Sequence, residues 1–192
     1  FRQVAERVFT RKNAFFNITS THKDYRKIEK RIVGTVGVLS DKDWNVEEWN
    51  LKAVPLNEGF LTASNVQHVG KGANLYDLGF KYSGQFEVLK GLLRTGFLWD
   101  RVRVHGGAYG SGNSFDFFTG DYSLLSYRDP NLAETLEVYD EIADFLNHLE
   151  LPSEELTKII IGCVGKMDPP LTPDLKGKAS MIDHLTGRTH EM

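Results

Sequence analysis

The sequence has a single cysteine and no long apolar run, and each lack excludes a class of protein. Cys163 is the only cysteine in 192 residues, so no disulfide can form within the chain. It lies in the apolar run IIIGCV, which is typical of a buried, unreactive thiol rather than of a nucleophile. The apolar runs are too short to cross a membrane, and the first residues, FRQVAERVFTRKN, lack the apolar stretch of a signal peptide. We therefore expect a soluble protein of the cytoplasm or an organelle matrix, with no membrane partner.

Positive charge is not in excess either. The chain has 23 Lys and Arg residues against 26 Asp and Glu residues, a formal net charge of −3. No basic segment is long enough to attract nucleic acid locally, so we expect no nucleic-acid partner. The glycines of GKGANLYDLG match neither the dinucleotide fingerprint nor the phosphate-binding loop, which argues against nucleotide binding.

A zinc-binding motif is missing as well, although six histidines are available. A helical zinc site of a peptidase places two histidines one turn apart with a glutamate beside them, as in H-E-x-x-H or H-x-x-E-H. Neither pattern occurs, and His184 and His190 are too far apart for that geometry. The sequence also has no G-x-S-x-G segment for a serine nucleophile. We therefore expect that this chain alone binds no metal and catalyses no hydrolysis.

Length and composition are those of a globular domain. With 41% hydrophobic and 26% charged residues, 192 residues can bury a substantial core, and we expect one domain over residues 1–192. The chain begins with Phe1 rather than methionine, from which we expect a fragment or a processed product.

Hydrophobic periodicity predicts an α+β fold, with a mixed, largely antiparallel sheet and helices packed on one face. Residues 41–60 fit no period and are expected to form a surface loop in which Trp44 and Trp49 pack locally. The proline-rich segment 166–177 is expected to be an extended loop. The expected helices are 1–9, 22–39, 82–96, 132–149, 153–165 and 179–185, of which 22–39 is expected to face the core. The expected strands are a buried strand at 14–19, a β-rich stretch from residue 60, and a hairpin that turns at Gly120-Asp121.

The segment 98–131 concentrates the residues that suggest a function. Arg101 and Arg103 are expected at the C-terminal end of the helix 82–96, where a solvated helix terminus is the ordinary interpretation. Three glycines within five residues, at positions 106, 107 and 110, surround Tyr109 and allow a positive φ or a close backbone approach. The pair Asn131 and Glu134 resembles a capping box for the helix that follows.

These residues carry a family resemblance. The segments LWDRVRVHGGAYGSG and SYRDPNLAETLEVYD resemble the C-terminal region of the M16 metallopeptidases, specifically the presequence-protease branch of the pitrilysin/insulinase superfamily. The likeness extends to the segments KGAN and DPPLTPDLKG, and residues 40–58 carry little of it. It implies an M16-like domain, one of four homologous α+β domains that form two bowl-shaped halves and enclose peptides in a chamber.

The same resemblance implies a division of roles. Zinc would be bound by an H-x-x-E-H helix and a distal glutamate in the first domain, outside this chain, so the partners would be peptide substrates and the N-terminal half of the same polypeptide. Arg103 and Tyr109 match the positions whose side chains contact the scissile carbonyl and its oxyanion. A guanidinium and a phenol are suitable donors for both. His105, Gly106, Gly107 and Ala108 are candidates for lining the same substrate site, although for His105, Gly107 and Ala108 a structural role fits at least as well.

The prediction is therefore the C-terminal substrate-binding domain of a zinc-dependent oligopeptidase, inactive as an isolated chain. The alternative is a non-catalytic M16-like subunit that uses this fold for peptide binding or assembly. A pure scaffold has no need of two convergent donors, which favours the first interpretation. A free-standing domain for a small ligand is disfavoured by the missing start methionine and the abrupt end.

Overall fold

A computed structural model describes residues 1–43, 48, 50, 57–167 and 169–187 of the chain. Its contacts divide the chain into two compact units. One comprises residues 1–57 with 170–192, and the other comprises residues 58–169. Each unit is described below by itself. The expectation of a single domain over residues 1–192 stays a prediction.

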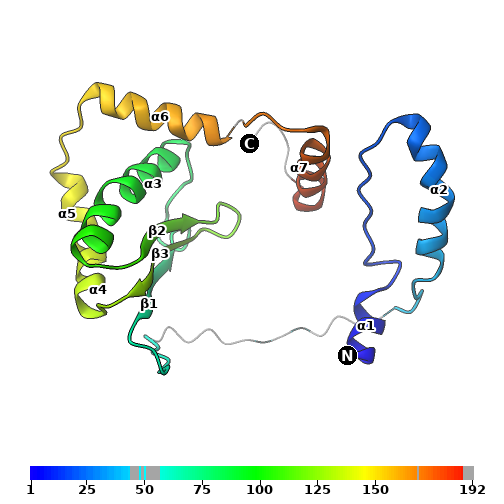
Figure 1. Cartoon of the computed structure of the whole chain (residues 1–192), viewed down its shortest axis with the longest axis horizontal. Helices are drawn as coiled ribbons and strands as arrows, with labels where there is room; N and C mark the ends of the chain where they lie inside the picture. The colour runs from blue at the N-terminus through cyan, green and yellow to red at the C-terminus, as the bar shows by residue number, and fades with distance from the viewer. Residues whose placement is uncertain (44–47, 49, 51–56, 168, 188–192) are drawn as a thin grey trace. The chain divides into compact units, whose positions relative to one another are not determined.

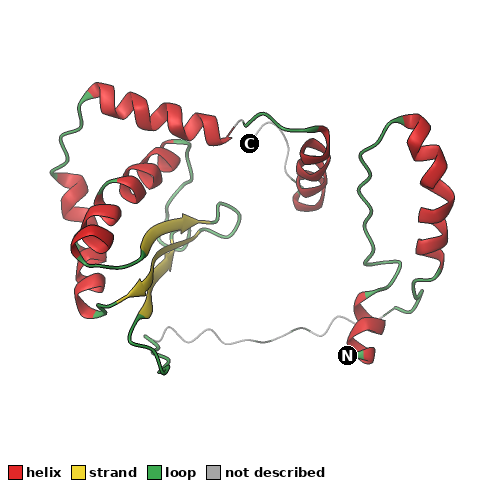
Figure 2. Ribbon diagram, viewed as in Figure 1, coloured by secondary structure: helices red, strands yellow, loops and turns green. Residues whose placement is uncertain are grey.

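The unit 58–169 contains a three-stranded antiparallel sheet, which Figures 1 and 2 show beside its helices. The strands are β1 (Gln67–Asn74), β2 (Gly110–Phe115) and β3 (Asp121–Asp129), in the order β1-β3-β2. β2 and β3 form the expected hairpin, and Gly120 has a φ of +83° just before β3 begins. The glycine-rich stretch from Gly110 is itself part of β2, whereas Phe117 and Phe118 lie in the connection rather than in a strand. The residues at 60–66 precede β1 and are not a strand.

The helices of this unit lie on one face of the sheet, as the α+β prediction requires. Along β3, Leu124 is buried toward the helices, whereas Leu125 and Tyr127 are 51% and 46% exposed on the opposite face. The helices are α3 (Gln85–Thr95), the π-helix η1 (Trp99–His105), α4 (Ala133–Asp140), α5 (Ile142–Asn147) and α6 (Ser153–Met167). Within the described residues all pairings in the sheet are antiparallel, and the largely antiparallel α+β fold is confirmed.

Two details of the expected helix 132–149 were wrong. The helix is interrupted at Glu141, which is the C-cap of α4 and the N-cap of α5. Asn131 does not cap it, since the N-cap residue is Leu132, which makes no side-chain cap hydrogen bond. The Asn131 side-chain amide donates instead to the Gly106 carbonyl, at 2.5 Å.

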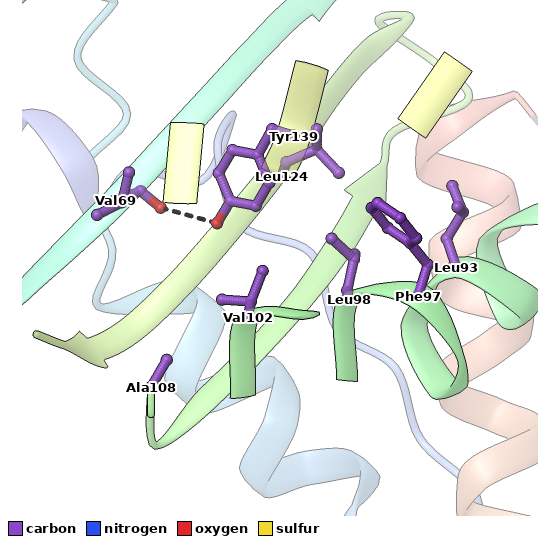
Figure 3. Packing of buried hydrophobic residues seen from close by; sticks show 8 residues of the cluster. All are labelled: Val69, Leu93, Phe97, Leu98, Val102, Ala108, Leu124 and Tyr139. Atoms are coloured by element: carbon purple, nitrogen blue, oxygen red, sulfur yellow. Dashed lines mark hydrogen bonds between the residues drawn. The ribbon is translucent and has the colours of Figure 1, made fainter. Parts of the chain in front are cut away.

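The core lies between the sheet and the helices (Figure 3). Leu98 and Val102, at 0% and 1% exposure, are packed with Val69 of β1 and Leu124 of β3. The hydroxyl of Tyr139 in α4 donates to the Val69 carbonyl, at 3.5 Å. Burial raises the pKa of Tyr139 to about 12 because the charged phenolate is poorly solvated there. The cluster of eight is Val69, Leu93, Phe97, Leu98, Val102, Ala108, Leu124 and Tyr139.

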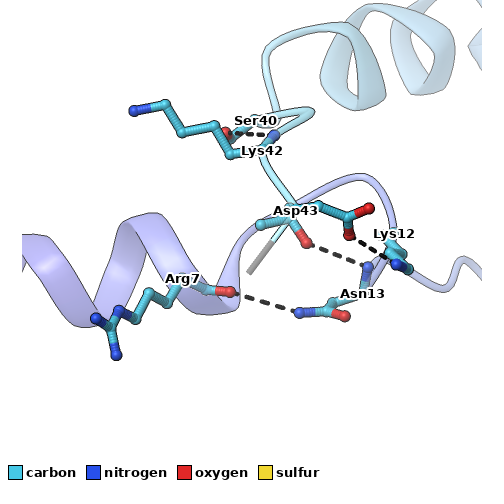
Figure 4. Close-up of polar contacts among 7 residues, drawn as sticks. Arg7, Lys12, Asn13, Ser40, Lys42 and Asp43 are labelled. Carbon is cyan, nitrogen blue, oxygen red and sulfur yellow. Dashed lines mark hydrogen bonds and ion pairs between the residues drawn. The ribbon is translucent and has the colours of Figure 1, made fainter. Parts of the chain in front are cut away.

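In its described residues, the unit of 1–57 and 170–192 contains three helices, and few of its side chains are even partly buried. The helices are α1 (Arg2–Val8), α2 (His22–Gly37) and α7 (Pro173–Thr186). Lys12 and Asp43 form an exposed ion pair at 2.6 Å (Figure 4), and Thr10 and Ser40 form an isolated parallel bridge. Thr10 is the only residue of this unit that is buried among those the structure describes.

Three expectations for this unit were wrong. Residues 14–19 form no strand, and Phe15 and Phe16 are 49% and 45% exposed. Their contacts are local to the unit: Phe15 stacks on His184, with the ring centroids 5.5 Å apart. The helix 22–39 is present as α2, but none of its residues is buried, so it does not face a core in this description. The expected extended loop 166–177 is helical from Pro173, because proline fits the first turn of a helix.

Some expectations lie outside the described residues. They concern Trp44 and Trp49, most of the loop 41–60, and His190.

Candidate functional site

The two arginines lie in a π-helix rather than at the end of α3. Gly96 ends α3, and the helical path resumes over η1, so the expected position of Arg101 and Arg103 was wrong by one helix. The wide turns are visible in the hydrogen bonds, since the Gly106 N–H donates to the Arg101 carbonyl five residues earlier, at 3.0 Å. Val102 anchors η1 in the core, which leaves the flanking arginines at the surface.

The surroundings of the two arginines differ. Arg101 forms an ion pair with Glu141, at 2.6 Å between Nη2 and Oε2. The guanidinium of Arg103 instead lies on the ring of Trp99, with 3.8 Å between its Cζ atom and the ring centroid. None of the carboxylates in the described part of the chain forms an ion pair with Arg103. Trp99 therefore orients the Arg103 guanidinium while leaving its N–H groups available to a ligand.

A tight turn after η1 places Tyr109 immediately before β2. Gly107 has a φ of +78°, which a residue with a side chain adopts only with strain. Beyond it Ala108 enters the core with 3% exposure, and its N–H donates to the Val102 carbonyl, at 3.2 Å. The Tyr109 backbone N–H then donates to the Arg128 carbonyl of β3, at 3.3 Å. Its side chain is left 64% exposed, so the turn directs the phenol to solvent.

Arg103 and Tyr109 line the same pocket. Its volume is about 550 Å³, and the two side chains come from η1 and from the turn just before β2. The structure thus brings together the two residues that the resemblance singled out. The other lining residues are Arg94, Thr95, Trp99, Gly110, Ser111 and Lys166.

Trp99, Arg94 and Lys166 are among the lining residues that were not identified from the sequence. A sequence pattern could have identified Trp99, because it precedes Arg103 by four residues and a helix places such pairs on one face. No sequence pattern identifies Arg94 and Lys166, since the packing of α3 against α6 brings them to the pocket. Long-range packing of this kind is not encoded in the local pattern.

The remaining expected site residues have local structural contacts. The His105 ring nitrogen Nδ1 lies 2.9 Å from the Asp100 carbonyl, one helical turn earlier. Gly106 presents its carbonyl to Asn131, and Ala108 is part of the core. Contact of His105, Gly106, Gly107 and Ala108 with a substrate stays a prediction.

The described residues offer no metal site of their own, because no three His, Cys, Asp or Glu side chains among them are grouped closely enough to hold an ion. Cys163 is buried, and its Sγ lies 3.4 Å from the Glu87 carbonyl, as expected for an unreactive thiol. No helix in the described part of the chain has the length and apolarity required to span a bilayer.

Comparison of the sequence with known proteins identifies relatives of this chain. Residues 57–192 match the family model of the PreP C-terminal domain. The chain is 37% identical to presequence protease 1, chloroplastic/mitochondrial, of Arabidopsis thaliana over 98% of its own length and 18% of that protein. It is 36% identical to the protein HypA of Clostridium perfringens, over 99% of the chain and 19% of that protein. It is 26% identical to the mitochondrial presequence protease of Mus musculus, over 77% of the chain and 14% of that protein. The chain thus spans about a fifth of the length of the Arabidopsis and Clostridium proteins.

Proposed function

The chain belongs to the PreP C-terminal domain family, and from that premise we propose that it is the C-terminal substrate-binding domain of a zinc-dependent oligopeptidase. Its partners are peptide substrates and the N-terminal half of the same polypeptide. The described residues of this chain do not fit a zinc ion, so the proposal assigns the metal, and its activation of the attacking water, to that N-terminal half.

Arg103 and Tyr109 bind the scissile carbonyl in this proposal. As water attacks, the carbonyl oxygen becomes an oxyanion, and hydrogen bonds from a guanidinium and a phenol become stronger. Donors that are already oriented cost little reorganisation during this step. Trp99 orients the guanidinium, and the turn at Gly107 orients the phenol.

The observation that carries the proposal is the shared pocket. Arg103 in η1 and Tyr109 in the turn before β2 line one cavity. Arg103 has no carboxylate partner among the described residues. The Tyr109 ring packs edge-on against Tyr127, with the centroids 5.6 Å apart, but the residue is 64% exposed, so its hydroxyl remains accessible to a ligand.

The test is made in the longest natural polypeptide that contains this chain, with a peptide substrate. Arg103→Ala and Tyr109→Phe are expected to lower kcat by roughly 10²-fold or more, because each removes one oxyanion donor. Zinc content and melting temperature are expected to stay near those of the unmodified protein.

The matched controls are Arg101→Ala and Tyr76→Phe. Arg101 is a neighbouring arginine with an exposed ion pair, and the Tyr76 hydroxyl donates to the Phe117 carbonyl away from the pocket. Both are expected to leave kcat unchanged. If Arg103→Ala and Tyr109→Phe also left kcat unchanged, the two side chains would not bind the oxyanion. If the polypeptide bound peptides without cleaving them, the non-catalytic M16-like subunit would be the better description.

A further inference from the structure

Among the described residues, the pocket that holds Arg103 and Tyr109 is lined by three cations and no carboxylate. Arg94 lies in the last turn of α3, and Lys166 lies in the last turn of α6. With Arg103 they surround one cavity, although only Arg103 belongs to the proposed oxyanion clamp. Arg94 and Lys166 line the pocket but are not part of that clamp, which raises the question of what they bind.

The position of these two cations follows from how α3 packs on α6. Gly91 lets the helices approach closely, since a Cβ atom placed there would lie 3.2 Å from Cys163 Sγ. Arg94 follows Gly91 by three residues, and Lys166 follows Cys163 by three residues, so each cation lies about one turn beyond the contact. The helix contact thus sets the backbone positions from which the Arg94 and Lys166 side chains reach the edge of the pocket.

The charges in this pocket are not compensated by the described part of the chain. Elsewhere in the same unit Lys90 and Arg101 each have a carboxylate within 2.9 Å. Arg94, Arg103 and Lys166 have no such partner among the described residues. Like charges that converge on one cavity repel each other, and a bound anion relieves that repulsion.

We infer that Arg94 and Lys166 bind a carboxylate of the substrate peptide, so that this domain selects peptides with an acidic group close to the scissile bond. The inference rests on the proposed function, because it uses the position of the clamp to place the peptide. A volume of about 550 Å³ accommodates an acidic side chain or a chain terminus, and Trp99 offers an apolar surface to its carbon atoms. Guanidinium and ammonium groups form their strongest hydrogen bonds with carboxylates.

The carboxylate has two sources, which one substrate set separates. Peptides of one sequence are prepared with Glu or with Gln at successive positions on either side of the scissile bond, and each is made with a free or an amidated C-terminus. The readout is the ratio of kcat/KM for the acidic peptide over its neutral counterpart, measured in the full-length protein. A ratio above one in the Glu/Gln pairs identifies a side chain, and a ratio above one in the acid/amide pairs identifies the C-terminus.

Arg94→Gln and Lys166→Gln are then expected to lower that ratio by roughly three- to tenfold each, the scale of one charged hydrogen bond at a partly open site. Lys158→Gln is the matched control, because Lys158 is an exposed lysine of the same helix that does not line the pocket. It is expected to leave the ratio unchanged. A ratio near one in every pair, or one that Arg94→Gln and Lys166→Gln do not lower, would overturn the inference.

Failure of the inference is separable from failure of the proposed function. If the clamp is right and the carboxylate site is wrong, Arg103→Ala still lowers kcat on all peptides, whereas Arg94→Gln and Lys166→Gln leave the ratio unaltered. If the clamp is wrong, Arg103→Ala leaves kcat on neutral peptides intact.

Discussion

At the scale of single residues, Asp129 is the side chain on which the junction between β3 and α4 depends. Its carboxylate is fully buried, with 0% exposure. It accepts hydrogen bonds from the Asn131 backbone N–H, at 2.9 Å, and from the Thr135 hydroxyl, at 2.8 Å. A buried carboxylate is tolerated only when its oxygens are bonded in this way. Asp129 therefore ties the chain after the hairpin to the first turns of α4.

Asp129→Ala is expected to lower the free energy of unfolding by about 2–3 kcal/mol, because it leaves the buried Thr135 hydroxyl and the partly buried Asn131 N–H without their acceptor. Urea unfolding of the chain measures this change. Asp140→Ala is the control, since Asp140 forms an exposed ion pair with Lys71, and its loss is expected to cost about 0–1 kcal/mol. Equal losses from both substitutions would contradict the structural role of Asp129.

The buried phenols predict how stability changes in alkali. Burial raises the pKa of Tyr122 and of Tyr139 to about 12 from an ordinary value of 10.0. Because the folded state holds these protons more tightly, the stabilisation is complete below pH 10 and is lost as the pH rises toward 12.

The melting temperature is accordingly expected to fall between pH 10 and pH 12. The melting temperature of the Tyr139→Phe variant, whose side chain cannot ionise, is expected to fall less steeply over the same range, whatever its value at neutral pH. Parallel curves for Tyr139→Phe and the unmodified chain would show that the phenol is not buried as described.

At the scale of elements, the turn between η1 and β2 sets the direction of Tyr109. Gly107→Ala is expected to cost about 1–2 kcal/mol, because a Cβ atom makes the φ of +78° unfavourable. Gly112→Ala in β2 is the matched control, since a Cβ atom there would meet nothing within 4 Å. Thermal unfolding of the two variants checks the prediction. A smaller loss for Gly107→Ala than for Gly112→Ala would mean that the turn is not held in this conformation.

The elements that the sequence predicted well are those with two independent signals. The helix α6 combines a Leu-Pro-Ser stop with two glutamates in its first turn, and the β2–β3 hairpin combines alternation with a Gly-Asp turn. For α3, periodic apolar residues and Gly96 set the helix and its end. Each of these signals acts within a few residues, which is why a pattern detects it.

The failures have physical reasons too. The apolar segment 14–19 satisfies a strand pattern, but a strand needs a neighbour, and the described residues around it provide none. The π-helix has no period that distinguishes it from an α-helix over seven residues. The family resemblance implied that Arg103 and Tyr109 share a site. Arg94 and Lys166 reach that site only through the contact of α3 with α6, which the sequence does not indicate.

At the scale of the whole molecule, the division of labour between this chain and the rest of a longer protein can be tested directly. The isolated chain is expected to retain no stoichiometric zinc after dialysis against a weak chelator and to cleave no peptide, since no metal-binding group is formed by its described residues. Elemental analysis and a peptide cleavage assay measure the two properties.

The full-length protein provides the comparison. It is expected to lose hydrolysis when a strong chelator removes zinc, while the melting temperature of the isolated chain is unchanged by the same treatment. One zinc ion per isolated chain, or peptide cleavage by it, would place the metal within these 192 residues and contradict the proposal.

The wide turns of η1 also make the spacing of this segment unusually intolerant to a change in length. Each π-type hydrogen bond spans one residue more than its α-helical counterpart. Deleting one residue between Trp99 and Val102 would allow ordinary α-helical bonds to form and would shorten the spacing of Trp99 and Arg103 from four residues to three. The Arg103 guanidinium would then lose its place over the Trp99 ring. Homologues that keep both side chains should therefore vary in composition here but not in the number of residues from Trp99 to Tyr109.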